Sequence, residues 1–203
     1  MVRTGISTGL NAMTLALALT LAPIAAKAEW KAVETTKPYA ISGTTAPELY
    51  ASIGARGPAL GGGRVIAHTT FKLTWTRNYQ PQASSCVLVS AVPKLTIIYT
   101  LPKPSSPLPP AMNAKWQTFI SGVAAHERVH GGFIRDMVHE IEVTSIGFTV
   151  ANDPDCRKIR IELTQRLGEI SARERQRNRD FDKTELSQGG AVHQLILNLV
   201  NGQ

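Results

Sequence analysis

The spacing of hydrophobic positions changes near the middle of the chain. In the first half it has period two, most clearly from Val65 to Trp75, where every second residue is apolar or threonine. This alternation is typical of a strand with one buried face. A second strand is expected within 86–102, where Pro93 indicates a bulge or a sheet edge. These segments predict an antiparallel sheet.

From Asn113 onward the period becomes that of an amphipathic α-helix. A second helix is expected to begin at Asp153, as its N-cap, with Pro154 at the first position. The two helices should pack as a hairpin, because each carries one apolar stripe. The stripe of the first helix consists of Trp116, Phe119, Ile120, Val123, Glu127, His130, Ile134, Met137, Val138 and Ile141.

The segment between the two patterns, PKPSSPLPP at 102–110, is expected to be a stiff linker, because proline fits neither a helix interior nor a central strand. The predicted fold class is therefore α+β, an antiparallel sheet followed by a long helix in a helical hairpin. With 203 residues, 43% of them hydrophobic, the chain can bury one good core. We expect a single domain over 29–203, β-rich over 29–101 and helical over 111–203.

Residues 1–28 have the features of a secretory signal, namely a basic start, a short apolar run and a small-x-small ending. No later stretch approaches the roughly 20 apolar residues of a membrane span. The mature chain is thus expected to be exported, to the periplasm or beyond, with no transmembrane anchor. In an oxidising compartment Cys86 and Cys156 are expected to form a disulfide.

The chain carries a formal net charge of +7. Much of the excess lies within 156–180, where Glu162, Glu169 and Glu174 are interleaved with the basic residues, as on a solvated helix face. Nucleic-acid binding needs a one-sided basic stripe with aromatic side chains for stacking, and this segment has no aromatic residue before Phe181. No nucleic-acid partner is expected.

The clearest candidate for chemistry is HERVH, residues 126–130. His126 and His130 lie about one helical turn apart, so both imidazoles can reach one zinc ion at about 2.0–2.1 Å. Glu127 would lie beside the open coordination position, where it can take a proton from metal-activated water and pass it to a leaving amine. These roles are those of the His-Glu-x-x-His peptidases.

The context of the motif favours a site over an accidental match. Glu127 and His130 fall on the apolar stripe, and unpaired burial of such groups is costly. Either a bound zinc ion or a hydrogen-bonded polar cluster would offset that cost. Gly131 and Gly132 in mid-helix indicate a close approach of another backbone, a kink below the metal, or tight helix packing.

The order of several segments resembles a family of bacterial predicted secreted zinc-dependent proteases, domain of unknown function 922. The matching segments are PYAISGTTAPEL, ARGP, KWQTFISGVAAHERVH and RDFDKTELSQGG. The resemblance implies a zincin-like peptidase in which His126 and His130 bind the metal and Glu127 is the general base. The chain departs from the family pattern at Ser187, where a histidine is expected.

A catalytic zinc needs a third protein ligand. Asp182 is the preferred residue, because it belongs to the Phe-Asp pair of the family tail. Glu174 continues the stripe of the second helix and is the first alternative, and Glu185 is the second. For Asp182 and Glu174 the competing interpretation is an acid paired with arginine for structural reasons.

The sequence therefore predicts an exported metallopeptidase that holds one catalytic Zn²⁺ and cleaves peptide or protein substrates. The alternative is a non-catalytic envelope module that keeps the fold with an incomplete metal site, as the residue at 187 suggests. A third interpretation is a basic protein that binds envelope polyanions independently of metal.

Overall fold

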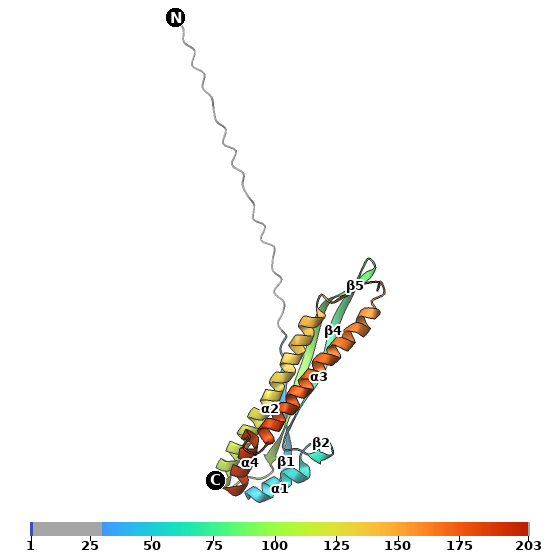
Figure 1. The fold of residues 1–203 in the computed structure, drawn as a ribbon. Helices are drawn as coiled ribbons and strands as arrows, with labels where there is room; N and C mark the ends of the chain where they lie inside the picture. Colours follow the sequence, from blue (N-terminus) through green and yellow to red (C-terminus); the bar gives the residue numbers. More distant parts are fainter. Residues whose placement is uncertain (2–29, 203) are drawn as a thin grey trace.

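Two long helices lie along a sheet in the computed structural model (Figure 1). The structure describes Met1 and residues 30–202, so the expected signal, 1–28, lies outside the described residues except for Met1. Helices α2 (Pro110–Ser145) and α3 (Lys158–Leu186) run side by side in opposite directions, which confirms the helical hairpin. Two shorter helices, α1 (Ala46–Arg56) and α4 (Ala191–Asn201), lie at the end of the molecule where α2 begins.

The two strands predicted within 65–76 and 86–102 do pair antiparallel, but the sheet as a whole is mixed, which corrects the expectation of an all-antiparallel sheet. Its strands lie in the order β1 (Val33–Ile41), β5 (Ser85–Pro104) and β4 (His68–Gln82), and the short β6 (Thr149–Val150) pairs with β5. β4 and β6 are antiparallel to β5, but β1 is parallel to it. Side-chain alternation shows that a strand exists but not its direction, which depends here on the connection through α1.

That connection also contains a small hairpin. β2 (Ala59–Leu60) and β3 (Gly63–Arg64) pair antiparallel beside α1, before the chain enters β4. The short helix, the hairpin and the N-terminal part of β4 together border one side of the candidate site described below.

The proline-rich linker is shorter than expected, because β5 extends to Pro104 and α2 begins at Pro110. Pro102 and Pro104 pair with β1, and Ser105 donates its main-chain N–H to Ile41. In a parallel ladder successive residues direct their N–H groups to opposite sides. The two proline nitrogens therefore face the side on which β4 pairing ends at His68, and they need no partner there.

Pro93 lies at a local edge of the sheet, which is one of the two features predicted for it. β5 is the central strand, yet β1 pairs with it only from Thr96 onward and β6 only as far as Val87. At Pro93 the described strands therefore flank β5 on the β4 side alone. The register shift in the β4–β5 ladder lies elsewhere, between Asn78 and Tyr79.

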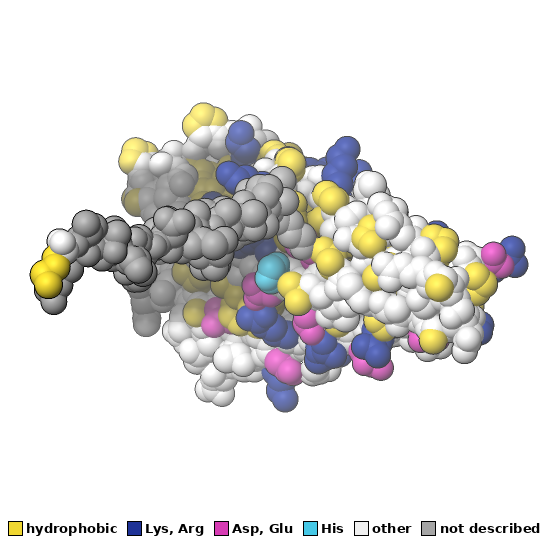
Figure 2. Space-filling model, turned by 90° about the horizontal axis from the view of Figure 1, so that it is seen from above, with side chains coloured by type: hydrophobic (Ala, Val, Ile, Leu, Met, Phe, Trp, Pro, Cys, Tyr) yellow, Lys and Arg dark blue, Asp and Glu magenta, His cyan; other side chains and the backbone are white. Residues whose placement is uncertain are grey.

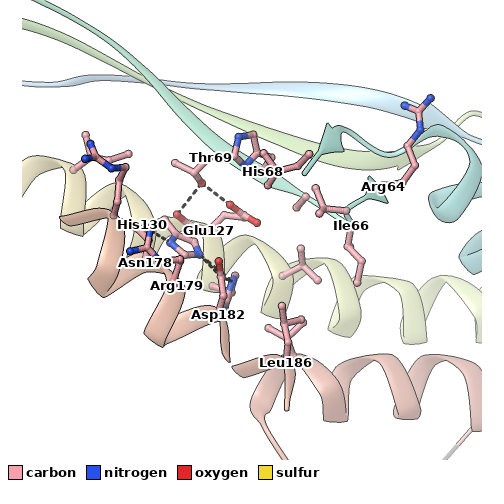
Figure 3. A pocket seen from close by; sticks show the side chains of 18 of the residues that line it. Arg64, Ile66, His68, Thr69, Glu127, His130, Asn178, Arg179, Asp182 and Leu186 are labelled. Atoms are coloured by element: carbon pink, nitrogen blue, oxygen red, sulfur yellow. Dashed lines mark hydrogen bonds and ion pairs between the residues drawn. The ribbon is translucent and has the colours of Figure 1, made fainter. Parts of the chain in front are cut away.

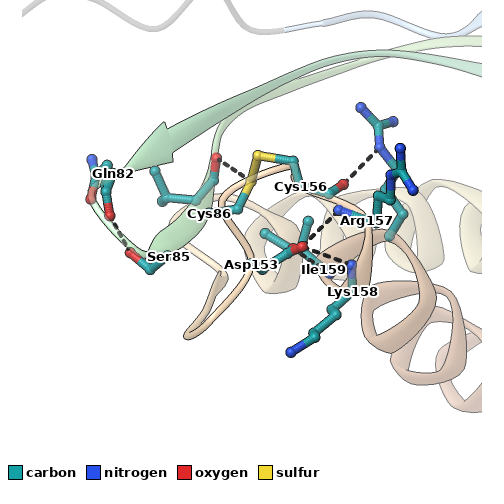
Figure 4. Close-up of a disulfide and its surroundings, with 10 residues drawn as sticks. Gln82, Ser85, Cys86, Asp153, Cys156, Arg157, Lys158 and Ile159 are labelled. Atoms are coloured by element: carbon teal, nitrogen blue, oxygen red, sulfur yellow. Dashed lines mark hydrogen bonds between the residues drawn. A yellow bond between two sulfur atoms is a disulfide. The ribbon is translucent and has the colours of Figure 1, made fainter.

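The predicted disulfide is present and joins Cys86 of β5 to Cys156, just before α3 (Figure 4). α3 begins at Lys158, later than predicted, because the residues after Asp153 first form a turn. The Asp153 carboxylate nevertheless caps the helix, since it accepts hydrogen bonds from the main-chain N–H groups of Arg157, Lys158 and Ile159. The β-rich part and the helical part are thus tied covalently at one end of the molecule.

The core lies between the sheet and the two long helices. The predicted stripe of α2 is buried along its length, with Ile120 partly buried. On α3 the buried residues are Ile159, Leu163 and Ile170. None of the helices in the described part of the chain is long and apolar enough to span a membrane. On the face shown in Figure 2, acidic side chains lie next to several of the lysine and arginine side chains.

Candidate metal centre

α2 directs three polar side chains of the HERVH motif to its buried side. The exposed fraction is 5% for Glu127, and 8% and 10% for the side chains of His126 and His130. The Thr69 hydroxyl on β4 lies 2.5 Å from Glu127 Oε2 and 3.1 Å from the Glu127 carbonyl oxygen, both of which can accept its hydrogen. The buried carboxylate is therefore held between the helix and a strand of the sheet (Figure 3).

α3 brings Asp182 to the two imidazoles. Asp182 Oδ1 lies 3.2 Å from His126 Nε2 and 2.9 Å from His130 Nε2, and the two Nε2 atoms are 3.1 Å apart. The three residues form a group that could hold a metal ion. Tetrahedral zinc with bonds of about 2.0–2.1 Å separates its ligand atoms by about 3.3 Å, so this triangle nearly matches one face of such a tetrahedron.

Asn178 orients His130 from the other side of the ring. Its Oδ1 makes a short hydrogen bond with His130 Nδ1, and its Nδ2 donates to Glu174 Oε1 at 2.5 Å and to the Glu174 carbonyl at 2.8 Å. An amide oxygen only accepts, so Nδ1 carries the hydrogen and Nε2 is the atom left for a ligand. Glu174 thus acts on the site through Asn178.

His126 is held by stacking. The Phe181 ring lies 4.7 Å from the His126 ring, centroid to centroid, with 18° between the planes, and it meets His130 edge-on at 5.3 Å. Within the described residues, the buried His126 Nδ1 has no hydrogen-bond partner. The Glu185 carboxylate oxygen Oε2 lies 3.8 Å from it, which is too far for a hydrogen bond. This orphaned nitrogen faces away from Asp182, so both histidines direct Nε2 to the same point.

The charges around the point where these three ligand atoms converge favour the binding of a cation. Burial lowers the pKa of His130, but hydrogen bonds with Asp182 and Asn178 and the nearby carboxylates outweigh it and raise the pKa. Burial would raise the pKa of Asp182, but the hydrogen bonds from His126 and His130 hold it well below the usual carboxyl range. Protons on the imidazoles can satisfy the carboxylate, and a metal ion bound by the same three atoms can do so as well.

The predicted residues separate into two groups. His126, His130 and Asp182 converge, whereas Glu174 and Glu185 lie beside them as neighbours of Asn178 and of His126 Nδ1. Ser187 lies at the end of α3, where its hydroxyl donates to the Lys183 carbonyl. The departure from the family pattern at this position therefore leaves the cluster of three intact.

Three residues of this arrangement were not predicted as part of it: Thr69, Asn178 and Phe181. A hydroxyl on the buried face of a strand was the available signal for Thr69. Asn178 precedes Asp182 by four residues, a spacing that places both on one side of a helix. Phe181 was noted only as part of the family tail.

The site opens onto a cavity of about 680 Å³. Its walls come from β4 and the segment before it, from α2, α3 and α4, and from single residues of α1, β2 and β3, among them Tyr50 and Arg64. Glu127 and the three convergent residues all line this space, so a molecule in the cavity could reach them (Figure 3).

The glycine pair after His130 has an unequal structural role. A Cβ atom on Gly131 would lie 2.2 Å from the Tyr99 hydroxyl and 3.0 Å from Cζ of the same ring, whereas Gly132 has space around it. Tyr99 is buried and donates a hydrogen bond to Glu34 at 2.8 Å, so it cannot move freely. The expected close approach is thus real, but it is made by a side chain of β5 and not by a backbone.

No curated protein and no solved structure matches this chain. A match with a protein family covers residues 36–190, which include both long helices and every residue of the cluster described above. The chain therefore belongs to the family described as bacterial protein of unknown function, DUF922.

Proposed function

We propose that the protein is an exported zinc-dependent metallopeptidase with a zincin-like active site. The observation that carries this proposal is the convergence of His126 Nε2, His130 Nε2 and Asp182 Oδ1 beside the buried Glu127, at the wall of a large cavity. Two imidazoles and one carboxylate are a common donor set of catalytic zinc, with a fourth position left for water or substrate. The disulfide supports export, because such bonds persist in oxidising compartments.

A zinc ion held by these residues would polarise a peptide carbonyl and bring the pKa of water close to neutral. Glu127 is placed to act as the general base and then the general acid. Thr69 binds its Oε2 atom and so fixes the carboxylate, which leaves the second oxygen free to take a proton from water and deliver it to the leaving amine.

β4 offers a place for the substrate main chain. It is an end strand in the order of the sheet, and no strand of the described residues pairs with its outer edge. An extended peptide can add to such an edge through main-chain hydrogen bonds. Because Thr69 lies near the start of β4, a peptide bound along this part of the strand would pass close to Glu127.

The test measures zinc content first and cleavage second. After dialysis the protein should retain one zinc ion per chain, and the zinc-loaded protein should cleave unfolded casein. Glu127→Gln keeps the shape of the side chain and should lower the cleavage rate by about 10²–10⁴-fold while zinc stays bound. Glu140→Gln, on the exposed side of the same helix, is the matched control.

Each outcome separates one alternative. Equal rates for the wild type and Glu127→Gln would remove Glu127 from the mechanism. Stoichiometric zinc without cleavage of any unfolded protein would favour the non-catalytic envelope module. A chain that binds no zinc would assign the cluster to hydrogen bonding alone.

A further inference from the structure

The six arginines of α3 fall into three sets. Arg173 and Arg177 form ion pairs with acidic residues of α2. Arg175 and Arg179 line the cavity instead, and within the described residues neither forms an ion pair with a carboxylate, although Arg179 donates a hydrogen bond to Gln176 Oε1. Two further arginines stack on aromatic rings outside the cavity, Arg160 and Arg166. Among these arginines, the two that border the candidate site are therefore the ones without an acidic or aromatic partner in the described residues.

A third arginine reaches the cavity from the opposite wall. Arg64 on β3 lines this wall and donates from Nη1 to the Gly57 carbonyl at 2.8 Å, and its guanidinium group points away from Asp182 and His130 (Figure 3). The cavity also holds three carboxylates, and each is already engaged by a neighbour within the site. A divalent cation bound there would therefore make the cavity positively charged.

The same cavity has a rim of large exposed apolar side chains. These come from four different elements and form part of its lining: Tyr50, Leu60, Phe71 and Leu186. Exposed apolar side chains around a concave site are typical of a surface that binds a ligand. The cavity thus combines an apolar rim with guanidinium groups that have no carboxylate partner among the described residues.

Building on the proposed peptidase activity, we propose that the cavity selects peptides that carry a carboxylate close to a large apolar residue, and that Arg175 and Arg179 bind this carboxylate. A guanidinium group presents paired N–H donors that match the two oxygens of a carboxylate. With a helical rise of about 1.5 Å per residue, Arg179 and Arg175 lie about 4.5 and 10 Å along α3 from Asp182, which places the carboxylate within a few residues of the scissile bond. It can come from an acidic side chain or from the C-terminus of the peptide.

The experiment uses one fluorescent octapeptide containing leucine and phenylalanine, made in four forms. The forms combine Glu or Gln at one position with a free or an amidated C-terminus. Binding to zinc-loaded Glu127→Gln protein is measured by fluorescence anisotropy, and hydrolysis by the wild type is measured as kcat/KM. Arg175→Gln/Arg179→Gln is the test variant, and Arg173→Gln, whose arginine is paired outside the cavity, is the control.

We expect a peptide with the recognised carboxylate to bind about tenfold more tightly than its neutral counterpart, as for a hydrogen bond between charged groups. The ratio should fall to within about threefold in the double variant, stay unchanged in Arg173→Gln and decrease with added salt. The Glu/Gln and acid/amide pairs show which source the site uses. Thermal unfolding checks that the double variant is folded, and the salt dependence tests the recognition with both arginines present.

The outcomes distinguish this inference from the proposed function. Equal binding and equal kcat/KM for all four peptides would overturn the inference and leave the peptidase intact. Carboxylate-dependent binding without hydrolysis of any peptide would support the inference and overturn the peptidase. A preference that persists in the double variant would show that other residues read the carboxylate and would overturn the assignment of Arg175 and Arg179.

Discussion

α2 and α3 both contribute to the candidate metal centre, but different forces hold them in place. α2 is buried along one face for most of its length, and the HERVH residues lie in the middle of that face. α3 has no buried residue after Ile170 among those described, although Asn178, Phe181 and Asp182 all follow it. The exposed fraction of the Asp182 side chain is 45%, against 8% and 10% for the histidines of α2.

This difference shows how the site is assembled. The histidines are positioned by a helix that packs against the sheet whether or not a metal is bound. Asp182 is positioned mainly by the site itself, through its contacts with the imidazoles and the stacking of Phe181. At its other end α3 is fixed by the disulfide and by the Asp153 cap. Metal binding should therefore stabilise the second half of α3 more than any part of α2.

The largest expected effect concerns the covalent end of α3. Replacing both cysteines, Cys86→Ser with Cys156→Ser, opens a connection between residues 70 apart and should lower the free energy of unfolding of the metal-free protein by about 4 kcal/mol. The disulfide lies just before the start of α3 and the cluster lies near its end, so zinc affinity at a temperature where the variant is folded should change less than about threefold. Urea unfolding and a chelator competition measure the two quantities. A large loss of zinc affinity would show that the two ends of α3 are coupled.

The second effect concerns the ligand that α3 supplies. Asp182→Ala should reduce zinc affinity by more than about 100-fold. Loss of a residue that only orients a ligand typically lowers metal affinity by about 10–100-fold, and loss of the ligand itself should lower it further. Asp180→Ala is the matched control, since Asp180 lies on the exposed side of the same turn and its carboxylate accepts a hydrogen bond from Gln176, away from the cluster. Competition with a chromophoric chelator measures both. If the two variants bind zinc equally, Asp182 is not a ligand, and Glu185, beside His126, becomes the residue to replace next.

A smaller loss of zinc affinity is expected for Asn178, a residue of α3 that orients His130 of α2 but is not itself a proposed ligand. Asn178→Ala removes the acceptor that orients His130 Nδ1 and should weaken zinc binding by about 10–100-fold. Gln176→Ala, two residues earlier and on the exposed side, should leave the affinity unchanged. Asn178→Asp combined with Glu174→Gln keeps an acceptor for the same hydrogen and lets the amide at 174 donate to the new carboxylate, so this pair should restore most of the affinity. A structural role alone would not produce this rescue, so failure of the paired variant would contradict the orienting role.

The same contrast explains what the sequence could predict. The stripe of α2 is continuous, so its period placed Glu127 and His130 on the buried face, where the structure has them. The stripe of α3 stops at Ile170, and nothing periodic marks the part that follows. Asp182 was chosen for its place in the family tail and not for any physical pattern. Asn178 was missed because one amide on a polar helix carries no signal until its partner is known.

The sheet was predicted in part for a related reason. Alternation identified β4 and β5, because each has one face toward the helices. The direction of β1 depends on a connection through α1 and a small hairpin, which side-chain patterns do not encode. The prolines at 102 and 104 misled the prediction because their nitrogens face the side where the neighbouring strand has ended.

The smallest effect tests packing directly, through one glycine on each helix. Gly168→Ala on α3 should stabilise the protein by about 1 kcal/mol, since alanine favours a helix and a Cβ there meets nothing within 4 Å. Gly131→Ala on α2 gains the same propensity but drives a methyl group against the buried Tyr99 ring, and overpacking of this kind costs about 1–3 kcal/mol. Gly132→Ala, one residue along and with space around it, controls for propensity on α2 and should stabilise. Thermal unfolding ranks the three variants. If Gly131→Ala were instead more stable than the wild type, the Tyr99 ring would have to move aside easily. The packing of α2 beside His130 would then be no tighter than the packing of α3 beside Asp182.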